Sequence, residues 1–284
     1  MKIGVIGGSG LYDMAELKVK KTEKVATPFG EPSDEFIIGE LNGKEVVFLP
    51  RHGKGHTILP SELNFRANIY AMKTLGVGRI LSVSAVGSLK EEIKPGHIAF
   101  PDQFIDRTFA RNSTFFGGGI VAHVSFADPI CKDLLGTVSE AAKRAGASVH
   151  VGGAYVNMEG PQFSTRAESH MYRGWNASVI GMTNLNEAKL AREAEICYVT
   201  IALSTDYDCW YEEEADVTTE AILAIIKQNV EMSQKIIKES VSSIGEKCSA
   251  GCMDALANSI MTDHKLIPEQ TKKDLAPIIG KYVK

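Results

Sequence analysis

The chain alternates between apolar stretches typical of strands and amphipathic stretches typical of helices. Residues 196–203 are β-branched and apolar without a regular polar alternation, which predicts a strand buried on both faces. The stretches 35–39 and 45–49 flank Asn42-Gly43, a strong signal for a β-hairpin. Shorter apolar stretches predict further strands at 3–6, 79–84, 149–158 and 178–182.

Amphipathic stretches between these strands predict the helices. Apolar residues recur at helical spacing from Ser61, the expected N-cap, to Leu75. Further helices are predicted at 133–145, at 164–173 after a Ser/Thr cap, and at 218–244. No repeat, linker or change of composition marks a boundary, so we expect one α/β domain over 1–284, a mixed β-sheet flanked by helices. Residues 245–284 form a less regular helical tail of this domain.

Composition excludes several classes of function. The 284 residues include 31 basic and 35 acidic ones, so the chain lacks the positive charge of a nucleic-acid-binding surface. No apolar run reaches membrane-spanning length, and the first residues lack the apolar core of a signal peptide. We therefore expect a cytoplasmic protein that binds neither nucleic acid nor membranes.

The cysteines do not indicate a disulfide framework. Their number is odd, and only Cys248 and Cys252 are close in sequence. That pair lacks the usual two-residue spacing of a metal site, and no second Cys/His pair accompanies it. We interpret it as a pair of free thiols and expect no metal, while a local disulfide stays open for a hyperthermophilic source.

Two carboxylates follow the buried strand. Asp206 and Asp208 lie beside Tyr207 and Trp210. Ligands of open α/β sheets bind beyond the carboxyl ends of the strands, where a catalytic acid is expected. Burial among aromatic rings disfavours the charged form of an acid, which raises its pKa and lets it donate a proton near neutrality. The alternative is a solvated acidic turn.

Other strand ends carry groups that suit an anion. The glycine-rich turn at 7–10 offers backbone N–H groups, but Asp13 replaces the third glycine of a dinucleotide fingerprint. Arg51 follows the second hairpin strand and can bind phosphate through two N–H bonds. Hydroxyl groups in the run 82–88 and at Thr183 follow two further strands. Each of these is weak alone, and together they predict an anion site.

Five segments, in order, resemble the 5′-methylthioadenosine phosphorylases, a family in the trimeric branch of the nucleoside phosphorylases: 6–11, 51–53, 57–61, 159–166 and 205–210. The resemblance extends from residue 3 to about residue 245. It implies a nucleoside phosphorylase-like fold and a homotrimer or dimer of trimers. It also implies small-molecule substrates, a nucleoside and inorganic phosphate, with no metal or organic cofactor.

The resemblance assigns site residues one by one. Phosphate binding falls to Ser9, Arg51, His52, Ser84, Ala85 through its backbone N–H, and Thr183. Nucleoside binding falls to His123, Phe163, Met182, Asp206, Tyr207 and Asp208. In the family, the phenylalanine stacks on the base, the methionine lies under the ribose, and the histidine reaches the 5′ pocket of a neighbouring subunit. Asp206 is the expected catalytic acid.

Three positions bear on specificity. Ser164 stands where relatives acting on 6-oxopurines carry glutamate, and Asp206 where they carry asparagine. Carboxylate oxygens accept hydrogen bonds from an amino group, so both choices favour a 6-amino base. Thr219 stands near the sugar 5′ position, where the family often has valine.

The expected reaction is phosphorolysis of S-methyl-5′-thioadenosine to adenine and 5-methylthioribose 1-phosphate, a step of purine and methionine salvage. The nearest alternative is a broader purine nucleoside phosphorylase that acts on adenosine or 6-oxopurine nucleosides. A dehydrogenase-like nucleotide-binding module is disfavoured by the missing third glycine and by the absence of an acid at the ribose position.

Overall fold

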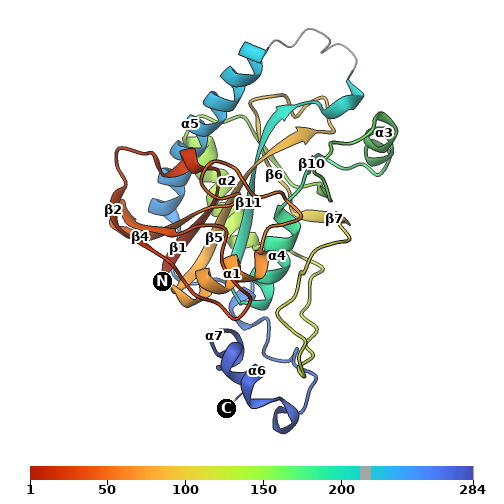
Figure 1. Ribbon diagram of the computed structural model, residues 1–284. Coiled ribbons are helices and arrows are strands. Elements are labelled where there is room, and N and C mark those ends of the chain that lie inside the picture. The colour runs from red at the N-terminus through yellow and green to blue at the C-terminus, as the bar shows by residue number, and fades with distance from the viewer. Residues whose placement is uncertain (212–218, 284) are drawn as a thin grey trace.

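Three parallel strands form the centre of the sheet: β1 (Lys2–Gly7), β5 (Val77–Ser88) and β11 (Cys197–Asp206). In this computed structural model, which describes residues 1–211 and 219–283, β5 lies between the other two (Figure 1). The first eight residues of β11 are all buried, which confirms a strand covered on both faces. Because the three strands run in one direction, their carboxyl ends lie at the same end of the sheet.

The predicted hairpin extends this sheet beyond β1. It consists of β3 (Phe36–Leu41) and β4 (Lys44–Pro50), with β2 (Lys18–Glu23) as the edge strand. Asn42 and Gly43 have φ angles of 50° and 76°, the positive values that a tight two-residue hairpin turn requires. The second hairpin strand runs parallel to β1, so the residues that follow it also reach the carboxyl end.

Two further branches complete a mixed sheet of 11 strands. On the β11 side, β6 (Ile98–Phe100) pairs antiparallel with β11, and β8 (Val149–Val151) pairs parallel with β6. The last residues of β5 pair antiparallel with β10 (Val179–Gly181), which is followed by β9 (Ala154–Met158) and β7 (Gln103–Arg107) in parallel. The chain therefore has the predicted mixed sheet.

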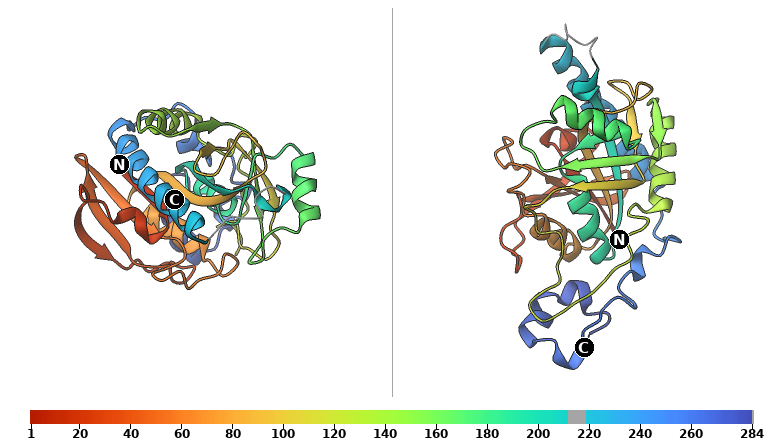
Figure 2. Two further views of the ribbon diagram at one scale, coloured as in Figure 1. Left: turned by 90° about the horizontal axis from the view of Figure 1, so that it is seen from above. Right: turned by 90° about the vertical axis from the view of Figure 1, so that its right-hand side faces the viewer.

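Helices cover both faces of the central strands, as Figures 1 and 2 show. On one face, α1 (Phe65–Thr74) packs on α4 (Asn184–Glu193), and both contact β5. On the other face, α2 (Lys132–Arg144) and α5 (Thr219–Ser243) pack together against β11. At the end of the sheet, α3 (Arg166–Gly174) lies beside the turn that follows β11. Within the described residues, none of these helices is both long and apolar enough to span a membrane.

The tail extends away from the sheet at the lower end of the view in Figure 1. Its short helices are η4 (Cys252–Asp254), η5 (His264–Leu266), α6 (Glu269–Asp274) and α7 (Ala276–Ile279). The tail contacts the long loop between β7 and α2: the His123 amide donates to the Ser259 carbonyl at 2.8 Å, and the Thr271 hydroxyl donates to the Gly118 carbonyl at 2.7 Å. The tail therefore supports that loop.

Some predicted boundaries are wrong. The first helix begins at Phe65 rather than at Ser61, because the Asn64 side chain caps it by accepting from the Ala67 amide at 3.1 Å. The expected single strand 149–158 is two strands, β8 and β9. Gly152 and Gly153, with φ angles of 91° and 90°, separate them. The sequence analysis missed β2, β6, β7 and α4.

Candidate active site

A cavity of about 840 Å³ lies at the carboxyl ends of the strands. The ends of β1, β4, β5, β9, β10 and β11 all contribute to its wall. Nine of the predicted site residues line it: Arg51, His52, Ser84, Ala85, Phe163, Met182, Thr183, Asp206 and Asp208. These residues come from five separate segments of the chain, so the fold brings together most of the predicted set.

Three predicted residues do not line this cavity. The Tyr207 hydroxyl donates to the Glu91 carbonyl at 3.0 Å, and the ring packs against Trp210. Ser164 lies behind the wall, with its hydroxyl 3.9 Å from the Met158 sulfur. His123 is exposed on the loop between β7 and α2. The side chains of two others, Ser9 and Thr219, lie outside the described residues.

Arg51 is held in a buried ion pair that the sequence did not indicate. Its Nε lies 2.5 Å from Oε1 of Glu187, a residue of α4. The guanidinium also donates to the Val83 carbonyl at 2.8 Å and to the Ser82 hydroxyl at 2.7 Å. Glu187 accepts two further bonds, from Ser82 at 2.6 Å and from the Tyr198 hydroxyl at 2.9 Å. The pair thus fixes the guanidinium in the wall of the cavity.

The short bonds of Arg51 use one hydrogen of each guanidinium nitrogen. Its remaining contacts, to the Ile6 carbonyl and to the second Glu187 oxygen, are long at 3.5 and 3.4 Å. A guanidinium carries five N–H bonds in a fixed plane, so one N–H of Nη1 and the N–H of Nη2 that makes only the long contacts remain able to donate to an anion in the cavity. Arg51 therefore combines a structural pair with capacity for phosphate.

Asn184, the first residue of α4, is the centre of a buried hydrogen-bond network. Its amide donates to the Ser82 hydroxyl at 2.9 Å and to the Tyr198 hydroxyl at 3.0 Å. Its carbonyl oxygen accepts from Ser84 at 2.7 Å and from Tyr155 at 3.1 Å. Because Ser84 has a single hydroxyl proton, that proton must turn away from Asn184 if Ser84 is to donate to an anion.

Thr183 lies at the amino end of α4 and is only 4% exposed. Its hydroxyl makes no capping bond to the helix. The positive end of a helix dipole favours an anion, and the free N–H groups of the first turn add to this effect. A hydroxyl and a helix terminus therefore face the same end of the cavity as Arg51.

His52 is neutral at physiological pH. Burial lowers its pKa to about 4, and the positive charge of Arg51 acts in the same direction. Its Nδ1 lies 2.8 Å from the Ile58 carbonyl, so the neutral ring carries its proton there. The ring stacks on His56 with centroids 4.3 Å apart. The other nitrogen, Nε2, is then an acceptor that suits a protonated phosphate oxygen.

The two carboxylates line the cavity from the end of β11 and the turn that follows it. Asp206 is exposed, and its Oδ2 accepts from the Thr205 hydroxyl at 2.6 Å. Its Oδ1 accepts from the backbone N–H of Asp208 at 2.7 Å. Gly87 on β5 allows this close approach, because a Cβ there would lie 3.1 Å from Oδ1 of Asp206. The geometry thus orients Asp206 through both of its oxygens.

The raised pKa that the sequence suggested for an acid in this turn falls on Asp208. Burial raises the pKa of Asp208, and the nearby charge of Asp206 raises it further. Its Oδ2 is buried, and the nearby hydroxyls of Ser169 and Ser164 act in the opposite direction on this pKa. A protonated Asp208 can therefore donate to an acceptor, whereas an ionised one accepts from an amino group.

A second buried ion pair, also missed from the sequence, supports the remaining wall. The Nε of Arg111 lies 3.0 Å from Oε1 of Glu159, and the Arg111 side chain is 1% exposed. The same guanidinium donates to the carbonyl of Met182 and to Asn186 at 3.0 Å. At the rim, Phe163 is 82% exposed. Its ring is available for stacking on a flat ligand.

The family of the chain follows from comparison with known proteins. A model of the phosphorylase superfamily matches residues 2–242, the part of the chain that forms the sheet and the cavity. Over 282 residues, the chain is 61% identical to S-methyl-5′-thioadenosine phosphorylase of Geobacter sulfurreducens, and the match covers 99% of each chain.

Solved structures agree. A methylthioadenosine phosphorylase from an Antarctic soil metagenomic library superposes with a TM-score of 0.93 at 50% identity, covering 97% of this chain and 98% of that one. The methylthioadenosine phosphorylase of Schistosoma mansoni, in complex with adenine, gives 0.82 at 37% identity, covering 90% and 96%. The chain therefore belongs to the S-methyl-5′-thioadenosine phosphorylase family of the phosphorylase superfamily.

Proposed function

We propose that the chain cleaves S-methyl-5′-thioadenosine with inorganic phosphate and releases adenine and 5-methylthioribose 1-phosphate. One observation carries the proposal: a single cavity is lined both by groups that suit an anion, Arg51 and the amino end of α4, and by two carboxylates, Asp206 and Asp208. The names of the similar proteins support the same reaction. The reaction needs no metal or organic cofactor, since phosphate is the second substrate.

Phosphate is the nucleophile of this reaction. The bond between C1′ of the ribose and N9 of the purine breaks while a bond between C1′ and a phosphate oxygen forms. Arg51, Thr183 and the backbone N–H of Ala85 hold the dianion in line with the bond that breaks, with His52, Ser84 and Ser9 as further contacts. The bound dianion also stabilises the positive charge that develops on the ribose, and its fixed orientation contributes much of the acceleration.

The purine leaves with the electron pair of the broken bond. Asp206 stabilises the departing base by donating a proton to N7 or sharing one with it, which yields neutral adenine. Asp208, next to it, accepts a hydrogen bond from the 6-amino group in its ionised form. Phe163 stacks on the base and Met182 lies under the ribose. Tyr207 and Ser164 lie behind the cavity wall and affect the base indirectly, through the turn that carries the two carboxylates.

In our proposal, the 5′ end of the nucleoside binds near Thr219 and near His123 of a neighbouring subunit. His123 is exposed and outside the cavity of its own chain, which agrees with a role across a subunit boundary. The assembly is then a trimer or a dimer of trimers, and the reaction takes place in the cytoplasm. The oligomer and the location rest on the sequence and on the family resemblance.

The test is an assay of purine base release by the purified chain with S-methyl-5′-thioadenosine, adenosine and inosine, each with and without phosphate; the first two release adenine and inosine releases hypoxanthine. We expect phosphate-dependent release with kcat/KM highest for S-methyl-5′-thioadenosine and lowest for inosine, because a 6-oxo group offers no donor to two carboxylates. Release without phosphate would indicate hydrolysis and overturn the proposal. Equal rates on inosine would favour the broader purine nucleoside phosphorylase.

A further inference from the structure

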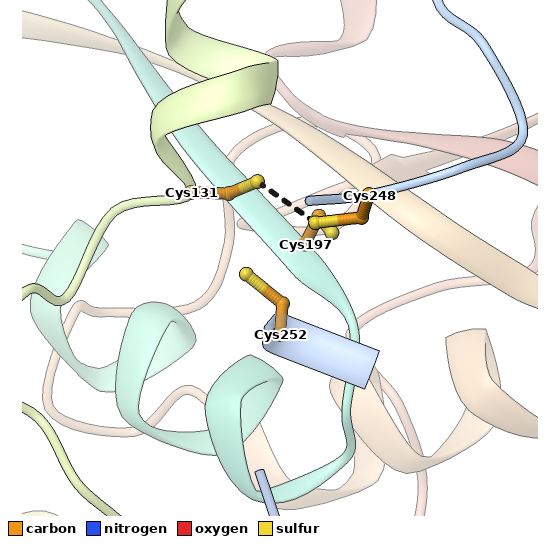
Figure 3. A group of neighbouring side chains, drawn as sticks. All are labelled: Cys131, Cys197, Cys248 and Cys252. Atoms are coloured by element: carbon orange, nitrogen blue, oxygen red, sulfur yellow. Dashed lines mark hydrogen bonds between the residues drawn. The ribbon is translucent and has the colours of Figure 1, made fainter. Parts of the chain in front are cut away.

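Four cysteines from three separate segments of the chain meet near the amino end of β11, whereas the cavity lies at the carboxyl ends of the strands (Figure 3). Cys131 precedes α2 as its N-cap, and Cys197 is the first residue of β11. Cys248 and Cys252 come from the start of the tail. The four sulfur atoms all lie within 4.8 Å of one another. Three of the residues are buried and Cys248 is half-buried.

The spacing of the sulfur atoms is that of a metal site. Zinc lies about 2.3 Å from each thiolate in a tetrahedral site, which places neighbouring sulfur atoms about 3.8 Å apart. The sulfur atoms of Cys131 and Cys248 are 3.7 Å apart. A disulfide bond requires about 2.05 Å. We propose that Cys131, Cys197, Cys248 and Cys252 bind one zinc(II) ion as a structural tetrathiolate site.

The charge of Arg79 supports this site independently. Arg79 is only 3% exposed, and a buried cation is costly unless an anion lies beside it. Among the described residues it makes no ion pair with a carboxylate: it donates to the Cys197 sulfur at 3.0 Å and to the carbonyls of Gly78 and Glu246. Four thiolates around a divalent cation carry a net negative charge, which supplies the anion that Arg79 requires.

Two further features prepare the cysteines for zinc. The Ser249 hydroxyl donates to Asp133 at 2.8 Å, so the loop that carries Cys248 is held against the first turn of α2. Cys131 is the N-cap of that helix, so the same contact also keeps its sulfur close to that of Cys248. The site is nine residues along β11 from Asp206, about 30 Å at strand spacing, so zinc takes no part in the reaction.

The role of the ion is to fasten the tail. Cys248 and Cys252 are its only ligands in the tail, whereas Cys131 and Cys197 belong to the core. The tail in turn supports the loop that carries His123, through the carbonyl of Ser259. Zinc would therefore join the tail to the sheet and stabilise the loop from which His123 extends.

The first test measures metal content. The untagged full chain, expressed in zinc-supplemented medium and purified without chelator, should contain about one zinc per chain. Cys248→Ser and Cys252→Ser should each lose most of the zinc. Cys209→Ser is the matched control, since Cys209 lies outside the cluster, and it should keep the ion. Equal zinc in all four proteins would place the ion elsewhere and overturn the proposal.

The second test uses the wild-type chain, so it does not depend on the folding of any variant. Cobalt(II) in place of zinc should give the thiolate charge-transfer bands and the intense visible bands of a tetrahedral sulfur site, and added zinc should abolish them. Removal of the ion by a chelator should lower Tm, and added zinc should restore the original Tm. Wild-type protein without zinc, or with these cysteines found as disulfides by mass spectrometry, would overturn the proposal.

Discussion

Arg51 and Glu187 form a buried ion pair, with Nε of the arginine 2.5 Å from Oε1 of the glutamate and neither side chain more than 4% exposed. The pair couples the phosphate end of the cavity to α4. Because Glu187 offsets part of the guanidinium charge, the phosphate dianion meets a partly neutralised site. Removal of the arginine alone would leave a buried carboxylate, which typically costs about 3–5 kcal/mol of stability.

Arg51→Lys separates the phosphate role from the structural one better than Arg51→Ala, because it keeps the charge beside Glu187 and removes the planar fork. We expect KM for phosphate to rise by roughly tenfold or more, while KM for the nucleoside changes little. Steady-state kinetics with each substrate varied in turn measures both constants. Arg144→Lys, at an exposed arginine on α2, is the control. Equal increases in both constants would show that Arg51 is structural.

Asp206→Asn tests the catalytic acid. The amide has the same shape and can still accept from the Asp208 N–H, so the fold should be unchanged. The rate on S-methyl-5′-thioadenosine should fall by roughly a hundred- to ten-thousand-fold, the range for loss of an acid that assists the leaving group. Adenine release under single-turnover conditions measures it, with the exposed Asp102→Asn as control. A near-normal rate would remove Asp206 from this role.

The raised pKa of Glu193 predicts how the free energy of unfolding depends on pH. Burial raises its pKa from its ordinary 4.5 to about 7, although the Phe115 amide and the Thr114 hydroxyl donate to it at 2.7 Å. Between pH 4.5 and about pH 7, the Glu193 carboxyl therefore keeps its proton in the folded chain and has lost it in the unfolded chain. This contribution to stability is complete below pH 4.5 and is lost as the pH rises through 7, at most about 3 kcal/mol.

Glu193→Gln mimics the protonated side chain at every pH. The variant should match the wild type near pH 4.5 and exceed it above pH 7. Urea unfolding of both proteins across this range measures the difference. Parallel stability curves for the two proteins would show that Glu193 ionises normally in the folded chain. Glu140→Gln, at an exposed glutamate on α2, should leave the curve unchanged over the same range.

The sequence predicted the strands and helices whose apolar pattern is regular, such as β11 and the hairpin. It missed α4 for a physical reason. Asn184 and Glu187 are three residues apart on its buried face, where an amphipathic helix normally has apolar residues. These polar residues belong to the hydrogen-bond network behind the phosphate site. Because they replace apolar residues on the buried face, the helix lacks the apolar periodicity by which a helix is predicted.

Some residues of the candidate site could likewise be predicted from the sequence, and others could not. Residues at strand ends, such as Arg51 and Asp206, could be found because strand ends gather at one edge of the sheet. Glu187 and Arg111 could not, since neither follows a strand and their partners are distant in sequence. For the same reason, the four cysteines appeared as one close pair and two isolated residues, and only the fold brings Cys131 and Cys197 to that pair.

His123 predicts that the active site is complete only in an oligomer. It is exposed, lies outside the cavity of its own chain, and is fixed through its backbone by Ser259 of the tail. If its side chain forms part of a neighbour's 5′ pocket, His123→Ala should weaken the binding of S-methyl-5′-thioadenosine by about 1–3 kcal/mol and leave KM for phosphate unchanged. His170→Ala, at an exposed histidine on α3, is the control.

Dilution tests the same relationship without a substitution. The specific activity of the wild type should fall at concentrations where sedimentation shows dissociation, because each subunit then lacks one wall of its 5′ pocket. The activity of His123→Ala should fall less steeply with dissociation, since its pocket lacks the histidine in either state. A fully active monomer would contradict the shared site. A wild type and a variant that lose activity in parallel would show that dissociation acts through some other part of the interface.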